Sequence, residues 1–414
     1  MKHKFNASGF VLCILCVTAS LFGVNSTTTR EKIEGIVIGE KVKIHSDVLD
    51  EDRTILIGLP KRYHKFKQSY PVLYLLDAEF FFQQAVAAVQ FLSECEYIRN
   101  QPIPQMIIVG IVNVDRNRDF TPTHAPKQMN TFRFPTSGKV KVFLKFLETE
   151  LFPYIETNYK THPYRIIAGW SLGGLFTVYT FFEKPELFSA YLAISPSLWW
   201  DKDMYLGRAD SYLTRGQVSP KPFTVTLGAL EGGDMGRTVR NGLVPLMEDK
   251  LGADKSYEFI EISGEGHSYV PYKALYEGLL SLYRDWMMPN KILEEGFQGI
   301  ESFYKKLSKK YGYKVNIPES AYSRLASKLD GEGEKNEALE IAKRYLQAYP
   351  ESSYAHFYLG IRYQSRGDMK SAVSCYQKAI EVEKATSEPD SERIIMYEIS
   401  LDEVMIELKK KNRK

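Results

Sequence analysis

The most informative stretch of this chain runs Tyr164-Arg-Ile-Ile-Ala-Gly169-Trp170-Ser171-Leu172-Gly173-Gly174. It predicts a short apolar strand, a tight turn that carries Ser171, and a helix from about Leu172 to Phe182. The turn is so sharp that a Cβ two residues before or after the serine would meet its neighbours, which favours glycine at 169 and 173. The turn therefore presents the Ser171 hydroxyl. It also leaves the backbone N–H of Leu172 at a helix N-terminus, where negative charge is stabilised.

Apolar runs of strand length alternate with helical patterns up to about residue 289. The continuous apolar run 71–76 predicts a strand buried on both faces, and 139–159 predicts one long amphipathic helix with Val142 on its apolar face. Two alternating stretches within 41–59 predict an antiparallel pair at a sheet edge. Further strands are expected at 106–112, 191–194, 223–227 and 257–262, and further helices at 80–91, 236–251 and 268–287. This order predicts an α/β fold with a mostly parallel sheet covered on both faces.

A serine presented in this way needs a base and an acid, in the chain order Ser, Asp or Glu, His. His267 is the one histidine that follows Ser171 within the α/β part, in a glycine-rich loop directly after a predicted strand. The acid should follow the preceding strand, where the sequence offers Glu231 and Asp234. We prefer Glu231 and keep Asp234 as the alternative.

These motifs resemble the putative esterase family of α/β-hydrolases, which includes esterase D and the enterochelin esterases. The resemblance covers about residues 35–288. It rests on Tyr70-Pro-Val-Leu-Tyr-Leu-Leu-Asp77, Val109-Gly-Ile with Asp115-Arg-Asn-Arg-Asp119-Phe-Thr-Pro122, Ala168-Gly-Trp-Ser-Leu-Gly-Gly174, Ile194-Ser-Pro-Ser-Leu-Trp-Trp-Asp201, Gly228-Ala-Leu-Glu231 and Gly264-Glu-Gly-His267. It implies an α/β-hydrolase fold with Ser171 as nucleophile, His267 as base and Glu231 as acid. It also implies the backbone N–H groups of Leu172 and Glu79 as oxyanion donors. One departure is Ala78, where the family usually has glycine.

Four side chains near these motifs are candidate substrate contacts. Trp199 and Trp200 either form an aromatic wall or pack a loop. Arg116 and Arg118 either hold an anionic substrate or form an ion pair with Asp119 that fixes a loop. The expected activity is that of a serine carboxylic-ester hydrolase acting through an acyl-enzyme, with no metal or organic cofactor. Siderophore lactones, acylated glycans and simple short esters all remain open as substrates.

The character of the chain changes after Pro289, because strand patterns disappear. Residues 319–352 and 353–386 superpose at a spacing of 34, so that Gly333 matches Gly367 and Ala338 matches Ala372. This spacing predicts an all-α tetratricopeptide-like module at 315–414, after a linker helix at 290–314. The alternative is an unrelated helical bundle, because Tyr345 occupies a position that is usually small. Such a module could bind a protein partner, and the alternative function is an interaction protein with a vestigial hydrolase scaffold.

The N-terminus predicts an exported protein. A basic start, an apolar run at 10–24 and small residues before 27 indicate a signal peptide at 1–26, which leaves a hydrolase domain at 27–289. We expect a periplasmic or secreted protein without a membrane anchor after cleavage. The net charge of +3 gives no basis for nucleic-acid binding. Cys95 and Cys375 lie in different predicted domains, so no disulfide framework is expected, and the scattered histidines show no metal-ligand spacing.

Overall fold

The computed structural model describes residues 36–61, 63–64, 67–95, 100–128, 132–216, 221–251, 256–386 and 389–411. The predicted signal peptide, residues 1–26, lies outside the described residues. The chain divides into the units Met1–Val37 and Ile38–Lys414, and the fold described below belongs to the second unit.

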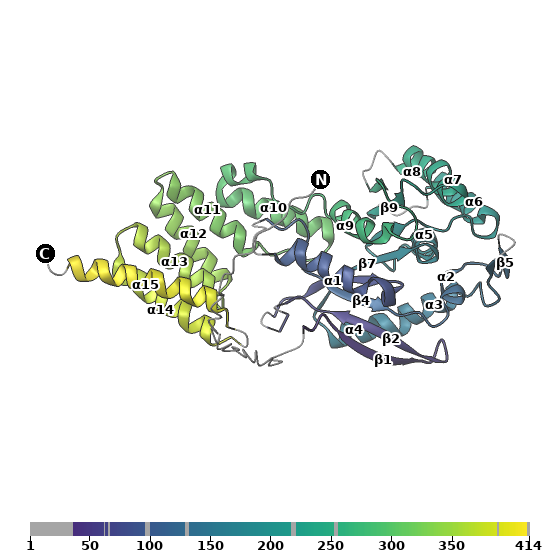
Figure 1. The fold of residues 1–414 in the computed structure, drawn as a ribbon. Coiled ribbons are helices and arrows are strands. Elements are labelled where there is room, and N and C mark those ends of the chain that lie inside the picture. Colours follow the sequence, from purple (N-terminus) through teal and green to yellow (C-terminus); the bar gives the residue numbers. More distant parts are fainter. Residues whose placement is uncertain are drawn as a thin grey trace, which may run out of the picture. The chain divides into compact units, whose positions relative to one another are not determined.

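Strands and helices alternate through the first part of the second unit, and helices alone follow (Figure 1). The strands are β1 (Glu40–Ser46), β2 (Glu51–Gly58), β3 (Tyr70–Leu75), β4 (Ile107–Ile111), β5 (Lys127–Gln128), β6 (Phe132–Arg133), β7 (Thr161–Trp170), β8 (Ala190–Ile194), β9 (Phe223–Gly228) and β10 (Tyr257–Ile262). The helices around them are α1 (Ala78–Glu94), α2 (Arg116–Phe120), α3 (Val140–Phe146), α4 (Phe152–Asn158), α5 (Leu172–Glu183), α6 (Trp200–Thr214), α7 (Gly233–Thr238), α8 (Val244–Leu251) and α9 (Val270–Leu282). The later helices are α10 (Gly296–Tyr311), α11 (Glu319–Gly331), α12 (Lys335–Ala348), α13 (Ser353–Ser365), α14 (Met369–Lys384) and α15 (Ser391–Lys411).

Eight strands form one sheet in the order β1-β2-β4-β3-β7-β8-β9-β10. β2 is antiparallel to both β1 and β4, and every other neighbouring pair is parallel. The predicted mostly parallel sheet with an antiparallel edge pair is therefore confirmed. The β5–β6 pair and the helices α2 and α6 were not predicted.

Alternate residues of the central strands enter two separate hydrophobic cores. In β3, Val72 and Tyr74 belong to the core that contains α3 and α5, whereas Leu73 and Leu75 belong to the core that contains α1 and α9. Successive side chains of a strand point to opposite faces of its sheet, so helices cover both faces. This double burial explains why β3 is an uninterrupted apolar run.

The predicted helix at 139–159 is continuous but contains a π-helical turn at Leu147–Leu151 between α3 and α4. One extra residue in that turn rotates the two halves of the helix relative to each other. Val142 is exposed to solvent, so its predicted place on the buried face was wrong.

The helical region repeats with the predicted spacing of 34 residues. α11 and α13 begin at Glu319 and Ser353, and Gly333 and Gly367 end the turns between paired helices with φ of 89° and 80°. Tyr345, the position that argued against the repeat, is fully buried and its ring stacks on that of Tyr322 at 5.6 Å. Assignment to the tetratricopeptide class stays a prediction.

Helix α10 packs on the sheet rather than linking two separate bodies. The Tyr311 ring lies 5.4 Å from that of Tyr164 in β7 and 5.3 Å from that of Tyr283, just after α9. Leu307 belongs to the same core as β3 and α9. The domain boundaries stay predictions, but α10 shares its core with the sheet.

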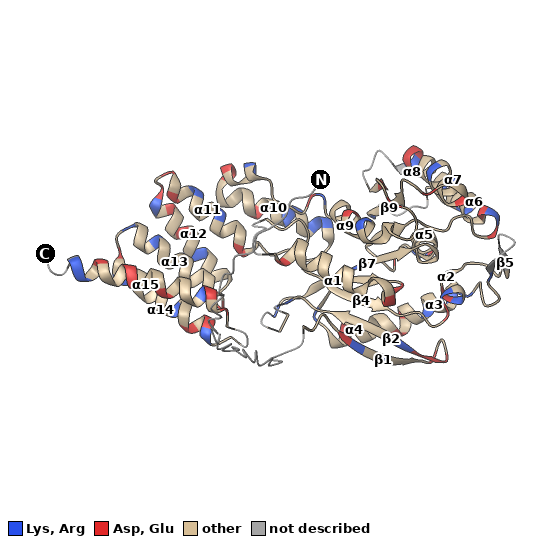
Figure 2. Ribbon diagram, viewed as in Figure 1, with Lys and Arg blue, Asp and Glu red and all other residues tan. Residues whose placement is uncertain are grey.

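Charged residues of both signs are interspersed along the described elements (Figure 2). Among the described residues, no helix has the length and apolar character needed to cross a membrane.

Candidate active site

The turn between β7 and α5 has the strained geometry that its sequence predicts. Ser171 has φ 59° and ψ −113°, a conformation that residues other than glycine rarely adopt. A Cβ on Gly169 would lie 2.3 Å from the carbonyl oxygen of Gly173, so the expected clash is present. The Ser171 N–H donates to the carbonyl oxygen of Ile194 at 2.9 Å, which fixes the turn to β8. The serine hydroxyl is therefore held at the carboxyl edge of the sheet.

Three residues far apart in sequence meet at this edge. His267 Nε2 lies 3.1 Å from Ser171 Oγ, and His267 Nδ1 lies 2.7 Å from Glu231 Oε2. Glu231 follows β9 and His267 follows β10, so both come from loops at the carboxyl ends of parallel strands. With Nδ1 protonated and bonded to the carboxylate, Nε2 is free to accept the serine proton.

The Glu231 carboxylate is held by more than the histidine. Its Oε1 accepts hydrogen bonds from the Ser195 hydroxyl at 2.5 Å and from the Gly228 backbone N–H at 2.9 Å. Burial by itself raises the pKa of this carboxyl group, but the hydrogen bonds from His267, Ser195 and Gly228 outweigh it and lower the pKa. Glu231 is therefore ionised at neutral pH, as the partner of an imidazolium must be.

Asp234, the alternative acid, lies in α7 and points elsewhere. Its Oδ1 accepts hydrogen bonds from Arg237 Nε at 3.2 Å and Nη2 at 3.0 Å, and its side chain is about half exposed. Of the two carboxylates that the sequence left open, Glu231 is therefore the one in contact with His267.

Ser197 is a second hydroxyl beside the nucleophile. Its Oγ lies 3.1 Å from Ser171 Oγ, and its N–H donates to the Ser171 carbonyl oxygen at 3.0 Å. A hydroxyl has only one proton, so when Ser171 donates to His267 the bond between the serines is donated by Ser197. Neither Ser195 nor Ser197 was identified from the sequence, because their loop bears no spacing that marks a role.

Side chains that directly follow β3 lie against the nucleophile turn. A Cβ on Gly173 would lie 3.2 Å from Asp77 Oδ2. Leu172 and Glu79 occupy the first turns of α5 and α1, where backbone N–H groups have no acceptor within their own helix. Both predicted oxyanion donors thus sit at helix N-termini near one edge of the sheet.

The departure at Ala78 is accommodated by β4. Ala78 is buried, and a Cβ on Gly110 would lie only 2.7 Å from the Ala78 Cβ. Glycine at 110 therefore provides the space that the methyl group of Ala78 fills.

Arg116 joins the two halves of the site. Its Nε and Nη2 donate to Asp77 Oδ1 at 2.6 Å and Oδ2 at 2.9 Å, and Nη2 also donates to the Trp170 carbonyl oxygen at 3.0 Å. Asn113 Nδ2 donates to Asp77 and to the Glu79 carboxylate, each at 2.7 Å. Arg116 is one-quarter exposed, so it holds the site together and still reaches solvent beside it.

Trp170, the residue before the nucleophile, contacts the base. Its Nε1 donates to the His267 carbonyl oxygen at 3.0 Å, and the two rings lie 4.8 Å apart. It therefore fixes both the loop and the imidazole of His267.

For two of the four candidate substrate contacts, the structure supports the packing or loop-fixing alternative rather than substrate binding. Trp200 is fully buried and donates from Nε1 to Thr123 Oγ1 at 3.0 Å, so its ring cannot reach a substrate. Arg118 is bonded through Nη1 and Nη2 to Glu51 and through Nε to Asp119, so it fixes a loop. Trp199 is half-buried and keeps part of its ring accessible.

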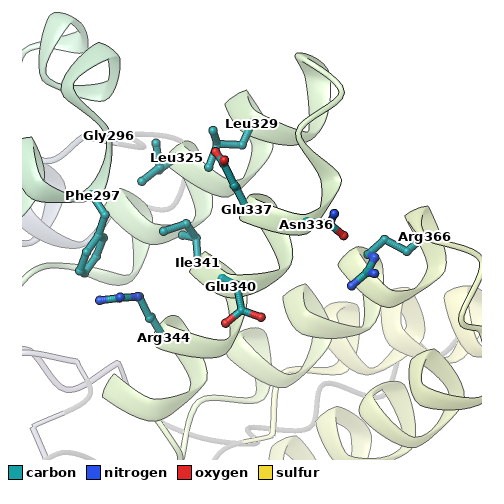
Figure 3. Close-up of a pocket in the computed structure, with 10 residues that line it drawn as sticks. All are labelled: Gly296, Phe297, Leu325, Leu329, Asn336, Glu337, Glu340, Ile341, Arg344 and Arg366. Atoms are coloured by element: carbon teal, nitrogen blue, oxygen red, sulfur yellow. The ribbon is translucent and has the colours of Figure 1, made fainter.

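A pocket of about 520 Å³ lies in the helical region, not at Ser171. Phe297, Leu325, Leu329 and Ile341 form its apolar part, and the Arg344 guanidinium lies 4.9 Å from the Phe297 ring (Figure 3). Among the described residues, no group of three or more His, Cys, Asp and Glu side chains is arranged to hold a metal ion.

Comparison with known proteins finds relatives that are described as esterases or serine hydrolases. The family model described as putative esterase matches residues 46–224, which include Ser171 and end before Glu231. The chain is similar to the ferri-bacillibactin esterase BesA of Bacillus subtilis, with 33% identity over 217 residues that cover 48% of this chain and 73% of that protein. An IroE-like serine hydrolase of Shewanella oneidensis superposes with a TM-score of 0.63 and 28% identity, over 75% of this chain and 99% of the other. An uncharacterised protein of Capnocytophaga ochracea shares the fold, with a TM-score of 0.56 and 18% identity over 89% of this chain and 99% of the other.

Proposed function

The chain belongs to the putative esterase family and is a serine ester hydrolase, and we propose that it cleaves siderophore-type carboxylic esters through an acyl-enzyme on Ser171. The observation that carries this proposal is the continuous set of contacts from Ser171 Oγ through His267 to Glu231. The siderophore class is supported by the name of the Bacillus relative. Acylated glycans remain the alternative substrate class.

In the proposed reaction, His267 Nε2 takes the proton of Ser171 as its oxygen attacks the ester carbonyl. The imidazolium that forms is stabilised by the ionised Glu231, 2.7 Å from Nδ1. His267 then gives the proton to the leaving alcohol, and the acyl group stays on Ser171. Water cleaves the acyl-enzyme by the same path, which restores the serine.

The backbone N–H groups of Leu172 and Glu79 stabilise the oxyanion in this proposal. Each such donor contributes roughly 3 kcal/mol in comparable sites. Asp77, Arg116 and Asn113 act indirectly, by holding the α1 start against the nucleophile turn.

The test is hydrolysis of p-nitrophenyl acetate, ferric bacillibactin and a feruloylated glycan by the full chain and by its Ser171→Ala variant. We expect activity on the first two that the variant loses by several orders of magnitude. Activity of the wild type on the glycan alone would refute the siderophore proposal. Equal activity of both proteins would refute Ser171 as nucleophile.

A second proposal concerns the helical region, which we propose binds a protein partner. The pocket between α10, α11 and α12 supports it, because apolar side chains lie open there beside Arg344 and Arg366 (Figure 3). The interaction protein with a vestigial hydrolase is disfavoured by the intact Ser171–His267–Glu231 contacts.

Export through the predicted signal peptide also remains a proposal, tested by the N-terminal sequence of the mature protein.

A further inference from the structure

Four large apolar side chains at the carboxyl edge of the sheet are exposed to solvent. Phe80 is 61% exposed, Val114 54%, Leu230 72% and Tyr269 78%. Exposed apolar side chains on the loops that carry a catalytic site are candidates for contacts with an apolar ligand. We name these four residues the apolar rim.

The rim lies on both sides of the nucleophile. Phe80 and Val114 follow β3 and β4, while Leu230 and Tyr269 follow β9 and β10. Ser171 follows β7, which lies between these pairs in the strand order β4-β3-β7-β8-β9-β10. With about 4.8 Å between strands, the rim spans roughly 24 Å, about 10 Å to one side of β7 and about 14 Å to the other.

Each rim residue is tied to a residue of the site by the backbone. Leu230 directly precedes Glu231, and its N–H donates to the Glu265 carbonyl oxygen at 3.0 Å. Tyr269 lies two residues after His267, and its N–H donates to the Gly266 carbonyl oxygen at 3.1 Å. The loops that carry the apolar side chains are therefore those that position the triad.

The other side of the rim adjoins the oxyanion donor. The Phe80 N–H donates to the Asp77 carbonyl oxygen at 3.0 Å, and Val114 follows Asn113, which holds the Glu79 carboxylate. Phe80 and Glu79 also line a pocket of about 380 Å³ together with Leu56, Phe82 and polar side chains of β1 and α1. A concave surface with both apolar and polar side chains thus begins directly beside Glu79.

The chemistry of the reaction assigns the two sides. His267 must deliver its proton to the leaving oxygen, so the alcohol lies on the His267 side, over Leu230 and Tyr269. The carbonyl oxygen points at the N–H groups of Leu172 and Glu79. With the alcohol on the His267 side, the acyl group is assigned to the opposite side of the nucleophile, where Phe80 and Val114 are exposed. The charged groups between these positions are bonded to protein: Asp77 to Arg116 and Glu231 to His267.

From this arrangement we infer that the apolar rim selects esters with a bulky apolar group on each side of the scissile bond. Leu230 and Tyr269 bind the alcohol, and Phe80 and Val114 bind the acyl group. This inference rests on the proposed ester hydrolysis at Ser171 and adds the residues that set its specificity.

The test uses three esters and reports ratios of kcat/KM. The esters are p-nitrophenyl acetate, 4-biphenylyl acetate with a bulky alcohol, and p-nitrophenyl 4-phenylbutyrate with a bulky acyl group. Leu230→Ser and Tyr269→Ser should each lower kcat/KM for the biphenylyl ester relative to p-nitrophenyl acetate by about fivefold, mainly through KM. Phe80→Ser and Val114→Ser should do the same for the phenylbutyrate. Phe91→Ser, on the same helix as Phe80 and 52% exposed, is the matched control and should change neither ratio.

Two results would overturn the inference. Ratios that match those of the Phe91→Ser control would show that the rim does not bind substrate. The opposite pairing of variants and esters would refute the assignment of sides. Variants whose melting temperature falls below that of the control are replaced by Leu230→Thr and Phe80→Thr before the ratios are judged. Failure of the wild type on all three esters, by contrast, would refute the proposed function rather than the rim.

Discussion

Replacing Glu231 by glutamine should stop proton transfer without changing the size of the side chain. Glu231 Oε1 accepts hydrogen bonds from the Gly228 backbone N–H at 2.9 Å and from the Ser195 hydroxyl at 2.5 Å, and Oε2 lies 2.7 Å from His267 Nδ1. The Gly228 N–H can only donate, so it holds the oxygen of the new amide. The NH₂ group must then face His267.

That orientation of the amide changes the tautomer of His267. An NH₂ group opposite Nδ1 requires Nδ1 to accept a hydrogen bond, so the proton moves to Nε2, 3.1 Å from Ser171 Oγ. A protonated Nε2 cannot take the serine proton. The equivalent change in a serine protease lowers kcat by about 10⁴, which corresponds to about 5.4 kcal/mol of transition-state stabilisation.

The assay is kcat for p-nitrophenyl acetate, with melting temperature as a check on folding. Asp234→Asn is the matched control, because Asp234 pairs with Arg237 and is half exposed, and it should stay within about twofold of wild type. The reasoning is refuted if Glu231→Gln keeps more than about a tenth of the activity, or if Asp234→Asn is the more damaging change.

Three further predictions follow from the same contacts. Ser195→Ala removes one donor from the buried Glu231 carboxylate, so kcat should fall about tenfold at an unchanged KM, whereas Ser195→Thr should restore most of it; equal losses in both would contradict this role. The folded protein holds the pKa of Glu231 below its unfolded value near 4.3. The stability that wild type has over Glu231→Gln should therefore be complete at neutral pH and should shrink as the pH falls through the lowered pKa, which thermal unfolding from pH 7 to 3 measures. A stability difference that grows in acid would contradict this sign. A chain ending after Val315 keeps α10 against Tyr164 and should hydrolyse p-nitrophenyl acetate near the full-length rate, whereas a chain ending at Pro289 should melt several degrees lower; equal melting temperatures would show that α10 adds nothing to the core.

Much of the fold could be predicted because its signals are local. The apolar run of β3 and the alternation in β1 and β2 are short patterns that fix strand type by burial alone. The spacing of 34 residues located the starts of α11 and α13, because a repeated helix pair repeats its turn glycines. The π-helical turn inside 139–159 could not be read in this way, since one extra residue in a turn leaves the apolar content of the segment unchanged.

The candidate site was predictable only in part. Ser171 and His267 are marked by a strained turn and by chain order. No local sequence pattern indicates that Trp200 is buried, because its contacts with Thr123 and Phe134 come from segments about 70 residues away. The same holds for Arg118, whose bonds to Glu51 cross from α2 to β2.

The sequence by itself determined the chain order of the eight strands of the main sheet, the nucleophile turn and the two carboxylates that could serve as acid. Those features follow from local backbone sterics and from the period of burial, which each short segment carries in itself. Only the tertiary structure decided between Glu231 and Asp234 and brought Ser195 and Trp170 to the pair of Glu231 and His267. The reason is that a contact between the loops after β7, β8, β9 and β10 depends on which strands are neighbours and where each loop directs its side chains, and no single segment encodes either.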